Sequence, residues 1–250
     1  MGNEKNPSLP IQSYTLCACA LRTSIGLRNE DDLQISRYDM ISLLQFDRTI
    51  FVWINTDWSN SFFDVIMPWV TRLGDTATVW LWIVFIGLLM SWQLAPFINI
   101  AQGRGQHRTI MKAFVLCCLY MALIYGVNAG AYIGLKHLFH RPRPFVQQSV
   151  ILRVSPATAS GLANDRSFPS GHACNAFMIA ALLAEQFRRK RYVFYGLAAL
   201  VALSRIYLGV HYPSDVIMGA CVGLVITWLM LFFRPLRNRI TREGLFSSRN

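Results

Sequence analysis

The stretch Ser167-Phe-Pro-Ser-Gly-His-Ala-Cys-Asn-Ala-Phe-Met-Ile-Ala-Ala-Leu-Leu-Ala-Glu-Gln-Phe187 joins a polar loop to an apolar helix. Pro169 fixes φ just before the turn, and Ser170 is a favourable N-cap residue. Gly171 lets the backbone approach a ligand without a Cβ in the way. The free N–H groups of the first turn suit an anion, and His172 beside them can give or take a proton. The alternative is an ordinary capped helix with a surface histidine.

Similar apolar segments recur along the chain and determine the expected fold class. Of the 250 residues, 54% are hydrophobic, and the mean hydropathy is +0.35. This is too apolar for an ordinary soluble domain and indicates a membrane protein. A helix of about 20 apolar residues crosses the hydrocarbon layer. We therefore predict an all-α, polytopic transmembrane helical bundle with about five spans, at residues 77–100, 113–135, 170–187, 192–209 and 215–233.

The first 75 residues are less regular. Residues 10–28 are partly apolar and supply a sixth span only if that span is irregular. Residues 29–32 are polar and predict a loop. Residues 43–73 are apolar but interrupted by costly polar groups, so we interpret them as amphipathic interfacial helices broken near residues 55–60. The predicted parts are an N-terminal segment without defined structure (1–42), a membrane domain (43–234) and a basic cytoplasmic tail (235–250).

Basic loops set the expected orientation in the membrane. Residues 101–112, the turn at 188–191 and the tail after 234 are strongly basic, which places them in the cytoplasm. Loops 136–169 and 205–214 then lie on the opposite, outer face, although the first of them is also basic. From size and motif style, we expect a bacterial inner membrane, with that outer face toward the periplasm.

Net charge and cysteine content limit the classes of ligand and metal that we expect the protein to bind. The net charge of +11 suits anionic lipid headgroups or a phosphorylated substrate, and the aromatic-rich apolar runs favour lipid over nucleic acid. The six cysteines include no CxxC pair that supports a zinc site. We therefore expect neither a metal nor a cofactor.

Three polar clusters fall where predicted spans end on the outer face. They cover Lys136–Pro144, Pro169–His172 and Ser204–Asp215. They supply three cations, Lys136, Arg143 and Arg205. An arginine fork binds phosphate oxygens bidentately, and lysine adds a point charge. Packing of the bundle is expected to bring the three clusters together around one phosphate group.

Two histidines and one carboxylate in these clusters can perform phosphoryl transfer. A histidine attacks phosphorus if its other nitrogen is held by a carboxylate, and a second histidine protonates the departing oxygen. Asp215 lies four residues after His211, across Pro213, and can fold back onto its ring. We assign His211 as nucleophile, Asp215 as its orienting partner and His172 as general acid, which then activates water to hydrolyse the phosphohistidine.

The spacing of these residues resembles a known family. Lys136-x6-Arg143-Pro144, Pro169-Ser-Gly-His172 and Ser204-Arg205-x5-His211-x3-Asp215 are similar to the three-part signature of the type 2 phosphatidic acid phosphatases, complete at every position. The resemblance covers roughly residues 75–233 and implies a metal-independent lipid phosphatase with a helical core. It assigns the same roles to the two histidines and Asp215, and it assigns phosphate binding to Lys136, Arg143, Ser170, Gly171 and Arg205. Many members have six spans, where we count five.

Each assignment has a simpler alternative. Arg205 can extend to the headgroups without a function, and Asp215 can merely cap its helix. Lys136 and Arg141 can be interface anchors. His137 and His140 lie in the first cluster but outside the signature, so structural or solvated roles suit them better.

The expected function is removal of phosphate from a lipid phosphomonoester or pyrophosphate. Candidate substrates are undecaprenyl pyrophosphate, phosphatidylglycerophosphate, phosphatidate and lipid A phosphate, and the loop 145–168 is expected to contribute to the choice. A phosphotransferase that passes the group to a second lipid begins with the same intermediate. A transporter of anionic lipid needs the cations but neither histidine. A vanadate-dependent peroxidase has a similar site, but the apolar spans favour the phosphatase. The sequence does not indicate an oligomeric state.

Overall fold

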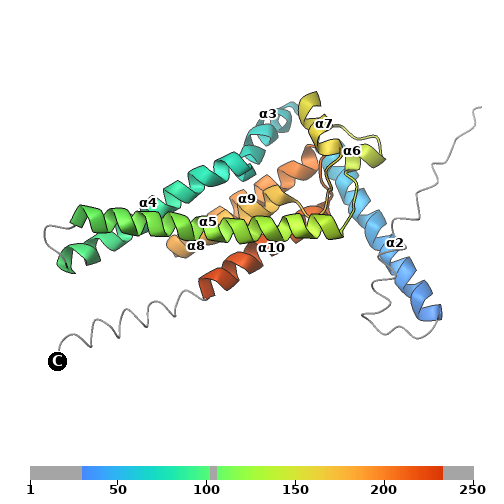
Figure 1. Cartoon of the computed structure of the whole chain (residues 1–250). Coiled ribbons are helices and arrows are strands. Elements are labelled where there is room, and N and C mark those ends of the chain that lie inside the picture. Colours follow the sequence, from blue (N-terminus) through green and yellow to red (C-terminus); the bar gives the residue numbers. More distant parts are fainter. Residues whose placement is uncertain (1–29, 102–105, 233–250) are drawn as a thin grey trace, which may run out of the picture. The chain divides into compact units, whose positions relative to one another are not determined.

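Helices are the only regular elements in the residues that the computed structural model describes, 30–101 and 106–232 (Figure 1). They are α2 (Glu30–Val52), the π-helix η1 (Trp53–Asp57), α3 (Ser61–Val70), the 3₁₀-helix η2 (Thr71–Gly74), α4 (Thr76–Ala101), α5 (Gln106–Leu138), α6 (Pro144–Gln147), α7 (Pro156–Ala163), α8 (Gly171–Gln186), η3 (Arg188–Lys190), α9 (Arg191–Tyr207) and α10 (Pro213–Phe232). The predicted all-α class is therefore confirmed.

Three of these helices are long and apolar enough to cross a membrane. The qualifying segments are Thr76–Gln93, Ile110–Leu138 and Pro213–Phe232, which overlap the first, second and fifth predicted spans. Helices α8 and α9 have 16 and 17 residues, fewer than the about 20 that cross the hydrocarbon layer without help. The count of five therefore stays a prediction. The possible sixth span at 10–28 and the tail at 235–250 lie outside the described residues.

The chain divides into two compact units between Arg48 and Thr49, and α2 crosses that boundary. The predicted loop at 29–32 is wrong where the structure describes it, because α2 already begins at Glu30. Acidic residues suit a helix N-terminus, where they face the positive end of the helix dipole. The predicted break near residues 55–60 is confirmed, since η1 ends at Asp57 and α3 begins at Ser61.

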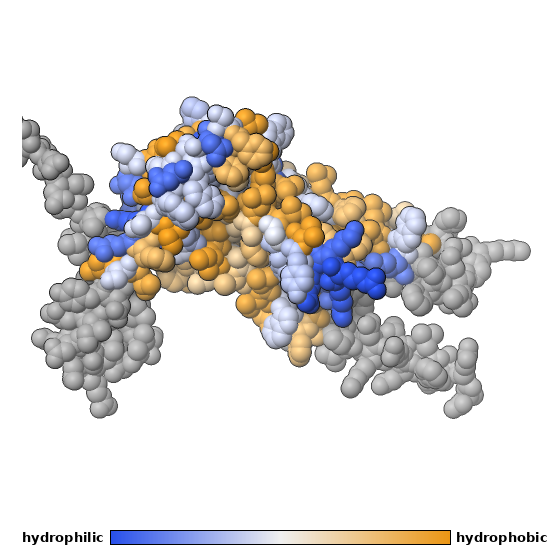
Figure 2. All heavy atoms as spheres, turned by 180° about the vertical axis from the view of Figure 1, so that it is seen from behind, coloured by the Kyte–Doolittle hydropathy of each residue, from blue (hydrophilic) through white to orange (hydrophobic). Residues whose placement is uncertain are grey.

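Helix α8 is central to the second unit and contacts α4, α5, α9 and α10. Met178 and Leu182 of α8 pack in one apolar cluster with Ile86 of α4 and with Met121 and Ile124 of α5. By contrast, large apolar side chains on the outer faces of α4 and α5 are exposed, as lipid-facing residues are. Figure 2 shows hydrophobic side chains over much of the surface, with hydrophilic side chains gathered in separate groups.

Two glycines bring α10 against α8. A Cβ on Gly219 would lie 2.4 Å from the carbonyl oxygen of Ser170, and a Cβ on Gly223 would lie 2.3 Å from that of Cys174. Neither distance is possible, so only glycine permits this backbone approach. Small residues four apart are a common device for close packing of membrane helices. The contact fixes the turn at Ser170 against the first turns of α10.

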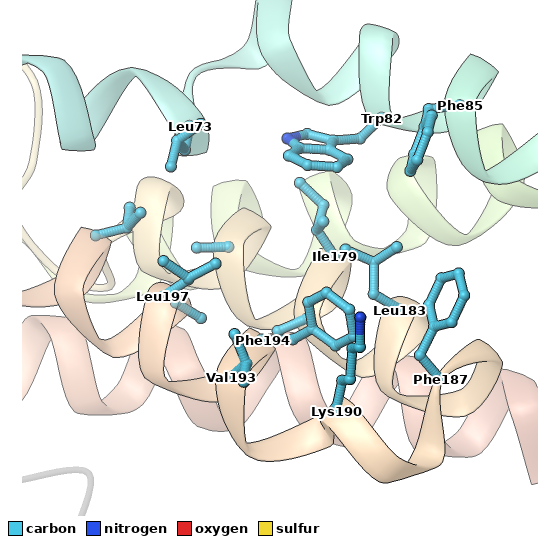
Figure 3. A pocket seen from close by; sticks show the side chains of 14 residues that line it. Leu73, Trp82, Phe85, Ile179, Leu183, Phe187, Lys190, Val193, Phe194 and Leu197 are labelled. Atoms are coloured by element: carbon cyan, nitrogen blue, oxygen red, sulfur yellow. The ribbon is translucent and has the colours of Figure 1, made fainter.

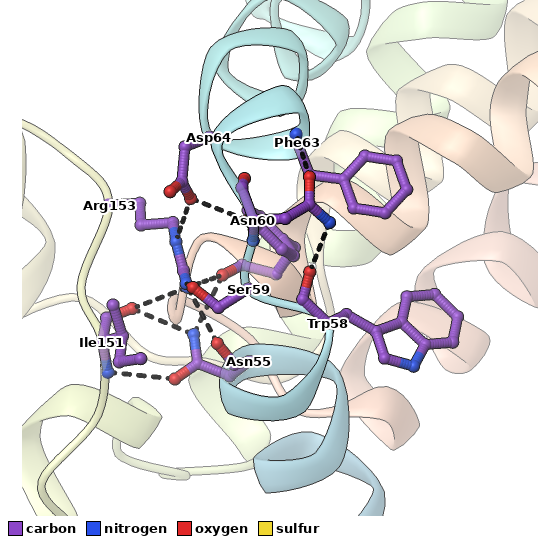
Figure 4. A network of polar contacts seen from close by, with 9 residues as sticks. Asn55, Trp58, Ser59, Asn60, Phe63, Asp64, Ile151 and Arg153 are labelled. Carbon is purple, nitrogen blue, oxygen red and sulfur yellow. Dashed lines mark hydrogen bonds and ion pairs between the residues drawn. The ribbon is translucent and has the colours of Figure 1, made fainter.

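A polar network ties η1 and α3 to the end of α9 (Figure 4). The Asn55 side chain is buried, donates to the carbonyls of Ile151 and Tyr207 at 2.9 Å each, and accepts from the Ile151 N–H. Arg153 donates to the Asp64 carboxylate at 2.6 Å and stacks over the Tyr207 ring. The network anchors the loop before α7 beside the segment that follows α9.

Candidate active site

A pocket of about 500 Å³ lies where the C-terminal ends of α5 and α9 meet the N-terminal end of α8. The structure brings six of the eight expected site residues to its wall: Lys136, Arg143, Gly171, His172, Arg205 and His211. Asp215 and Ser170 lie directly behind, joined by a hydrogen bond of 2.9 Å from the Ser170 N–H to the Asp215 carbonyl. The three sequence clusters therefore form one site.

His211 lies in the loop between α9 and α10 and is 2% exposed. Its Nε2 is 3.1 Å from Nη1 of Arg143. Because a guanidinium can only donate, Nε2 must accept, which leaves the ring proton on Nδ1. Burial, opposed by Asp215 and reinforced by the charge of Arg143, lowers the pKa of His211 to about 3. The ring is therefore neutral near pH 7, with a lone pair on Nε2.

Asp215 is fully buried in the first turn of α10. Its Oδ2 lies 3.6 Å from Nδ1 of His211, too long for a hydrogen bond, and that Nδ1 has no hydrogen-bond partner among the described residues. The carboxylate accepts instead from the Ser167 hydroxyl, from the Tyr212 N–H at 2.9 Å and from Arg141 at 2.7 Å. Acceptance from the Tyr212 N–H, three residues earlier, is a capping-box contact. Asp215 therefore caps its helix and also lies close to His211.

Arg141 is an ion-pair partner of Asp215 rather than only an interface anchor. Its guanidinium also donates to the Ser214 hydroxyl at 2.6 Å and lies over the Tyr212 ring, 4.0 Å from the ring centre. Sequence reasoning placed Arg141 outside the signature. In the structure it neutralises the buried carboxylate that faces the His211 ring.

Lys136 and Arg143 share one carboxylate. Asp165 accepts from Lys136 at 2.5 Å and from Nη2 of Arg143 at 2.6 Å. Burial alone would raise the pKa of Asp165, but hydrogen bonds and charge from the two cations hold that pKa below its ordinary value. The Lys136 side chain is 15% exposed, so this ion pair replaces the interface-anchor alternative. The Asp165 carboxylate accepts hydrogen bonds from the two cations, as the oxygens of a phosphate group would.

Arg205 is 5% exposed, so its side chain does not extend to the headgroups, and that alternative is wrong. Nη1 donates to the Thr71 hydroxyl at 2.8 Å, whereas Nε has no partner among the described residues. No carboxylate forms an ion pair with it in the part of the chain that the structure describes. The Ser170 hydroxyl is likewise buried and unpartnered there. Buried charges and hydroxyls are costly unless they are paired, so this corner of the site suits an anion.

The structure adds a contact that sequence reasoning missed. Nε2 of His172 lies 2.7 Å from the Asp75 carboxylate, which directly precedes α4. Nothing in the spacing links two residues 97 positions apart. The predicted topology did hold a signal, because the first span begins on the same outer face as the three clusters. An acidic residue at that end of a span was therefore a candidate.

The chain matches a known protein family. The model of the PAP2 superfamily matches residues 113–239. A lipid A 1-phosphatase of Rhizobium johnstonii is 29% identical over 158 residues, which cover 62% of this chain and 61% of that protein. Phosphatidylglycerophosphatase B of Bacillus subtilis is 36% identical over 130 residues, which cover 46% and 57%. The chain thus spans about three fifths of these relatives.

The fold is also similar to a solved structure. The transmembrane PAP2 type phosphatidylglycerolphosphate phosphatase of Bacillus subtilis superposes with a TM-score of 0.53 and 23% identity. The superposition covers 90% of this chain and 95% of that one. With the three apolar helices, this similarity identifies the chain as an integral membrane protein.

Proposed function

This chain belongs to the PAP2 superfamily, and we propose that it is a membrane phosphatase that hydrolyses a lipid phosphomonoester or pyrophosphate. The observation that carries the proposal is the buried Arg205, which has no ion-pair partner among the described residues, beside the unpartnered Ser170 hydroxyl. The pocket next to them is lined by His172 and His211. A phosphate group supplies the acceptors that these donors lack. In a phosphatase, the phosphate group of the substrate is held beside a nucleophile and a proton donor.

The proposed phosphate contacts come from three directions. Arg205 donates from α9, and Lys136 and Arg143 donate from the end of α5 and the loop behind it. Ser170 and the N–H of Gly171 donate from the first turn of α8, where the helix dipole is positive. Donors that are held in place before the reaction stabilise the charge that spreads over the phosphoryl oxygens in the transition state.

In the first proposed step, Nε2 of His211 attacks phosphorus and the bond to the leaving oxygen breaks. Protonated His172 gives its proton to that oxygen, so the lipid alcohol leaves neutral. The positive charge that develops on the His211 ring is stabilised by Asp215, and the 3.6 Å separation is expected to shorten at this stage. In the second step, His172 takes a proton from water while the water oxygen forms a new P–O bond, the P–N bond to Nε2 of His211 breaks, and inorganic phosphate leaves.

An apolar pocket supports a substrate with a hydrocarbon tail. It has a volume of about 480 Å³ and lies between α4, α8 and α9 (Figure 3). Leu73 and Val201 line it on one side, next to the turn that contacts His172, and Phe187 and Lys190 line it at the basic turn. The wall is otherwise made of apolar side chains, which suit an alkyl chain and not a polar group.

The active site is proposed to face the outer side of a bacterial inner membrane. Helix α8 runs from the pocket at Gly171 to Gln186, and the basic turn Arg188–Arg191 follows at once. The pocket and this turn therefore lie at opposite ends of α8. Because basic loops stay in the cytoplasm, the pocket faces the other side.

The test is a panel assay on the purified full-length protein in detergent. The substrates are phosphatidylglycerophosphate, a lipid A phosphate, phosphatidate and undecaprenyl pyrophosphate, with and without an acceptor lipid and with a chelator. The expected result is release of inorganic phosphate from at least one lipid, unaffected by the chelator. Transfer of the label to the acceptor would identify a phosphotransferase. Binding without turnover would favour a transporter and contradict the proposal.

Asp165→Asn is expected to tighten the binding of inorganic phosphate. The carboxylate that now occupies Lys136 and Arg143 competes with the ligand, so its neutralisation is expected to lower the inhibition constant of phosphate about tenfold. Product inhibition with a lipid substrate measures this constant. Asp57→Asn, an exposed acid away from the pocket, is the matched control. Weaker phosphate binding in Asp165→Asn would show that Asp165 holds the cations in place instead.

A further inference from the structure

The turn Thr71–Asp75 packs against the candidate site at several points. Its Thr71 hydroxyl accepts from Arg205, and its Gly74 carbonyl accepts from the Asn175 side chain at 3.1 Å. A Cβ on Gly74 would lie 2.9 Å from the carbonyl oxygen of His172, so the two backbones are in direct contact. Asp75 follows, with its Oδ1 2.7 Å from Nε2 of His172. The segment belongs to none of the three sequence clusters, yet it reaches two of their residues.

The contact between Asp75 and His172 has a direct chemical meaning. A carboxylate at hydrogen-bond distance favours the protonated form of an imidazole. It also fixes the ring, because Nε2 directed at Asp75 leaves Nδ1 as the nitrogen that can face a ligand. His172 must carry a proton when the substrate arrives, since its proposed role is to give that proton to the leaving oxygen.

The other charged groups that face His172 act in the opposite sense. Burial of the ring opposes a proton on His172, as do Arg205 from α9 and Arg143 from the loop after α5, and Asp75 is the carboxylate that favours one. Burial and the proposed phosphate-binding cations therefore reduce the fraction of His172 that carries a proton unless a negative charge offsets them. Asp75 is the group in the described chain placed to do this.

We propose that Asp75 is a positioning residue that holds His172 in the orientation and the protonation state required of a general acid. This inference rests on the proposed phosphatase activity. The site thus contains two histidine–carboxylate pairs with opposite tasks. Burial keeps the His211 ring neutral and ready to attack, and the Asp75 carboxylate favours the protonated His172 ring that can donate.

The competing explanation is that Asp75 only starts α4. Its carbonyl accepts from the Val79 N–H, as an N-cap residue does. Asparagine caps helices as well as aspartate does. Asp75→Asn therefore preserves the cap and removes the charge, which makes it the informative variant. Asp64→Asn is the matched control, because Asp64 is equally exposed and contacts Arg153 and Tyr207 but no histidine.

The experiment compares two leaving groups. An alkyl lipid phosphate such as phosphatidate needs a proton on its leaving oxygen, whereas the aryl ester 4-nitrophenyl phosphate departs without one. The value of kcat/KM covers the steps up to departure of the leaving group, so it excludes hydrolysis of the intermediate. In Asp75→Asn we expect kcat/KM for the alkyl ester to fall by about 100-fold, the lower end of a general-acid contribution, and that for the aryl ester to change little.

Two further readouts separate positioning from simple structural damage. Activity on the alkyl ester is lost as pH rises and His172 loses its proton, and in Asp75→Asn this loss is expected at lower pH because the stabilising charge is gone. In a double-mutant cycle, Asp75→Asn is expected to cause no further loss of kcat/KM in the His172→Ala background, because Asp75 acts through the His172 ring.

Equal losses on both esters, or full additivity with His172→Ala, would overturn the inference and leave the phosphatase activity standing. The same selective loss in Asp64→Asn would also overturn it. A wild-type protein that releases phosphate from neither ester would overturn the proposed function, and the inference with it.

Discussion

His211→Ala is expected to abolish phosphate release from lipid phosphates, with a fall in turnover of at least about 10⁴-fold. The imidazole supplies a buried nitrogen whose lone pair is directed at a cation, through the 3.1 Å contact from Arg143 to Nε2, and its other nitrogen faces the Asp215 carboxylate. Alanine offers no replacement nucleophile. The binding residues remain, so lipid phosphate is still expected to bind.

The intermediate gives a second measurement for this variant. Wild-type protein mixed with ³²P-labelled lipid and quenched in alkali is expected to carry label on histidine, and His211→Ala is expected to carry none. His140→Ala is the matched control, because His140 is exposed and does not line the pocket. Turnover or labelling of His211→Ala at the wild-type level would remove His211 from the nucleophilic role.

Arg205→Met is expected to lose activity and gain stability together. Activity is expected to fall by about 10³-fold, as when a preorganised donor to the transition-state oxygens is removed. The guanidinium is 5% exposed and has no carboxylate partner among the described residues, so its burial costs free energy of folding. Methionine fills similar space without that cost, and we expect the thermal unfolding midpoint in detergent to be equal or higher.

Stabilisation by inorganic phosphate gives a second test of whether Arg205 binds the phosphate group. Inorganic phosphate is expected to raise the unfolding midpoint of the wild-type protein and to have little effect on Arg205→Met, because a ligand stabilises only the state that binds it. Arg188→Met is the control, since Arg188 is highly exposed at the other end of α8. A strong drop in the midpoint of ligand-free Arg205→Met would show that Arg205 is structural.

The predictable part of the site is the part with local sequence signals. Proline, serine and glycine before an apolar run predicted the turn at Ser170, and α8 begins one residue later. The three clusters each sit at a helix end, so a bundle of antiparallel helices had to place them on one side. The order of the predicted spans was therefore enough to predict that the three clusters lie on the same side of the membrane, without knowledge of side-chain contacts.

The parts that sequence reasoning missed depend on pairing between distant segments. Asp75 meets His172 across 97 positions, and Asn55 meets Tyr207 across 152. The loop 145–168 was expected to contribute to substrate choice, but the contacts of its Asp165 with Lys136 and Arg143 depend on how that loop folds back. The length of α2 was missed because acidic residues at 30–32 suit both a loop and a helix start. In each case the local sequence is compatible with two structures, and tertiary packing selects one.

The glycine contact between α8 and α10 also limits how the protein can move. Asp215 lies one turn before Gly219, and the proposed phosphate-binding turn at Ser170 lies at the backbone that Gly219 contacts. The carboxylate that faces the proposed nucleophile and the proposed binding site for the anion therefore belong to one closely packed helix pair. A lipid with a bulky headgroup can therefore enter only if other walls of the pocket move. Substitutions intended to change the substrate range are best made in those walls, with the contact between α8 and α10 left intact.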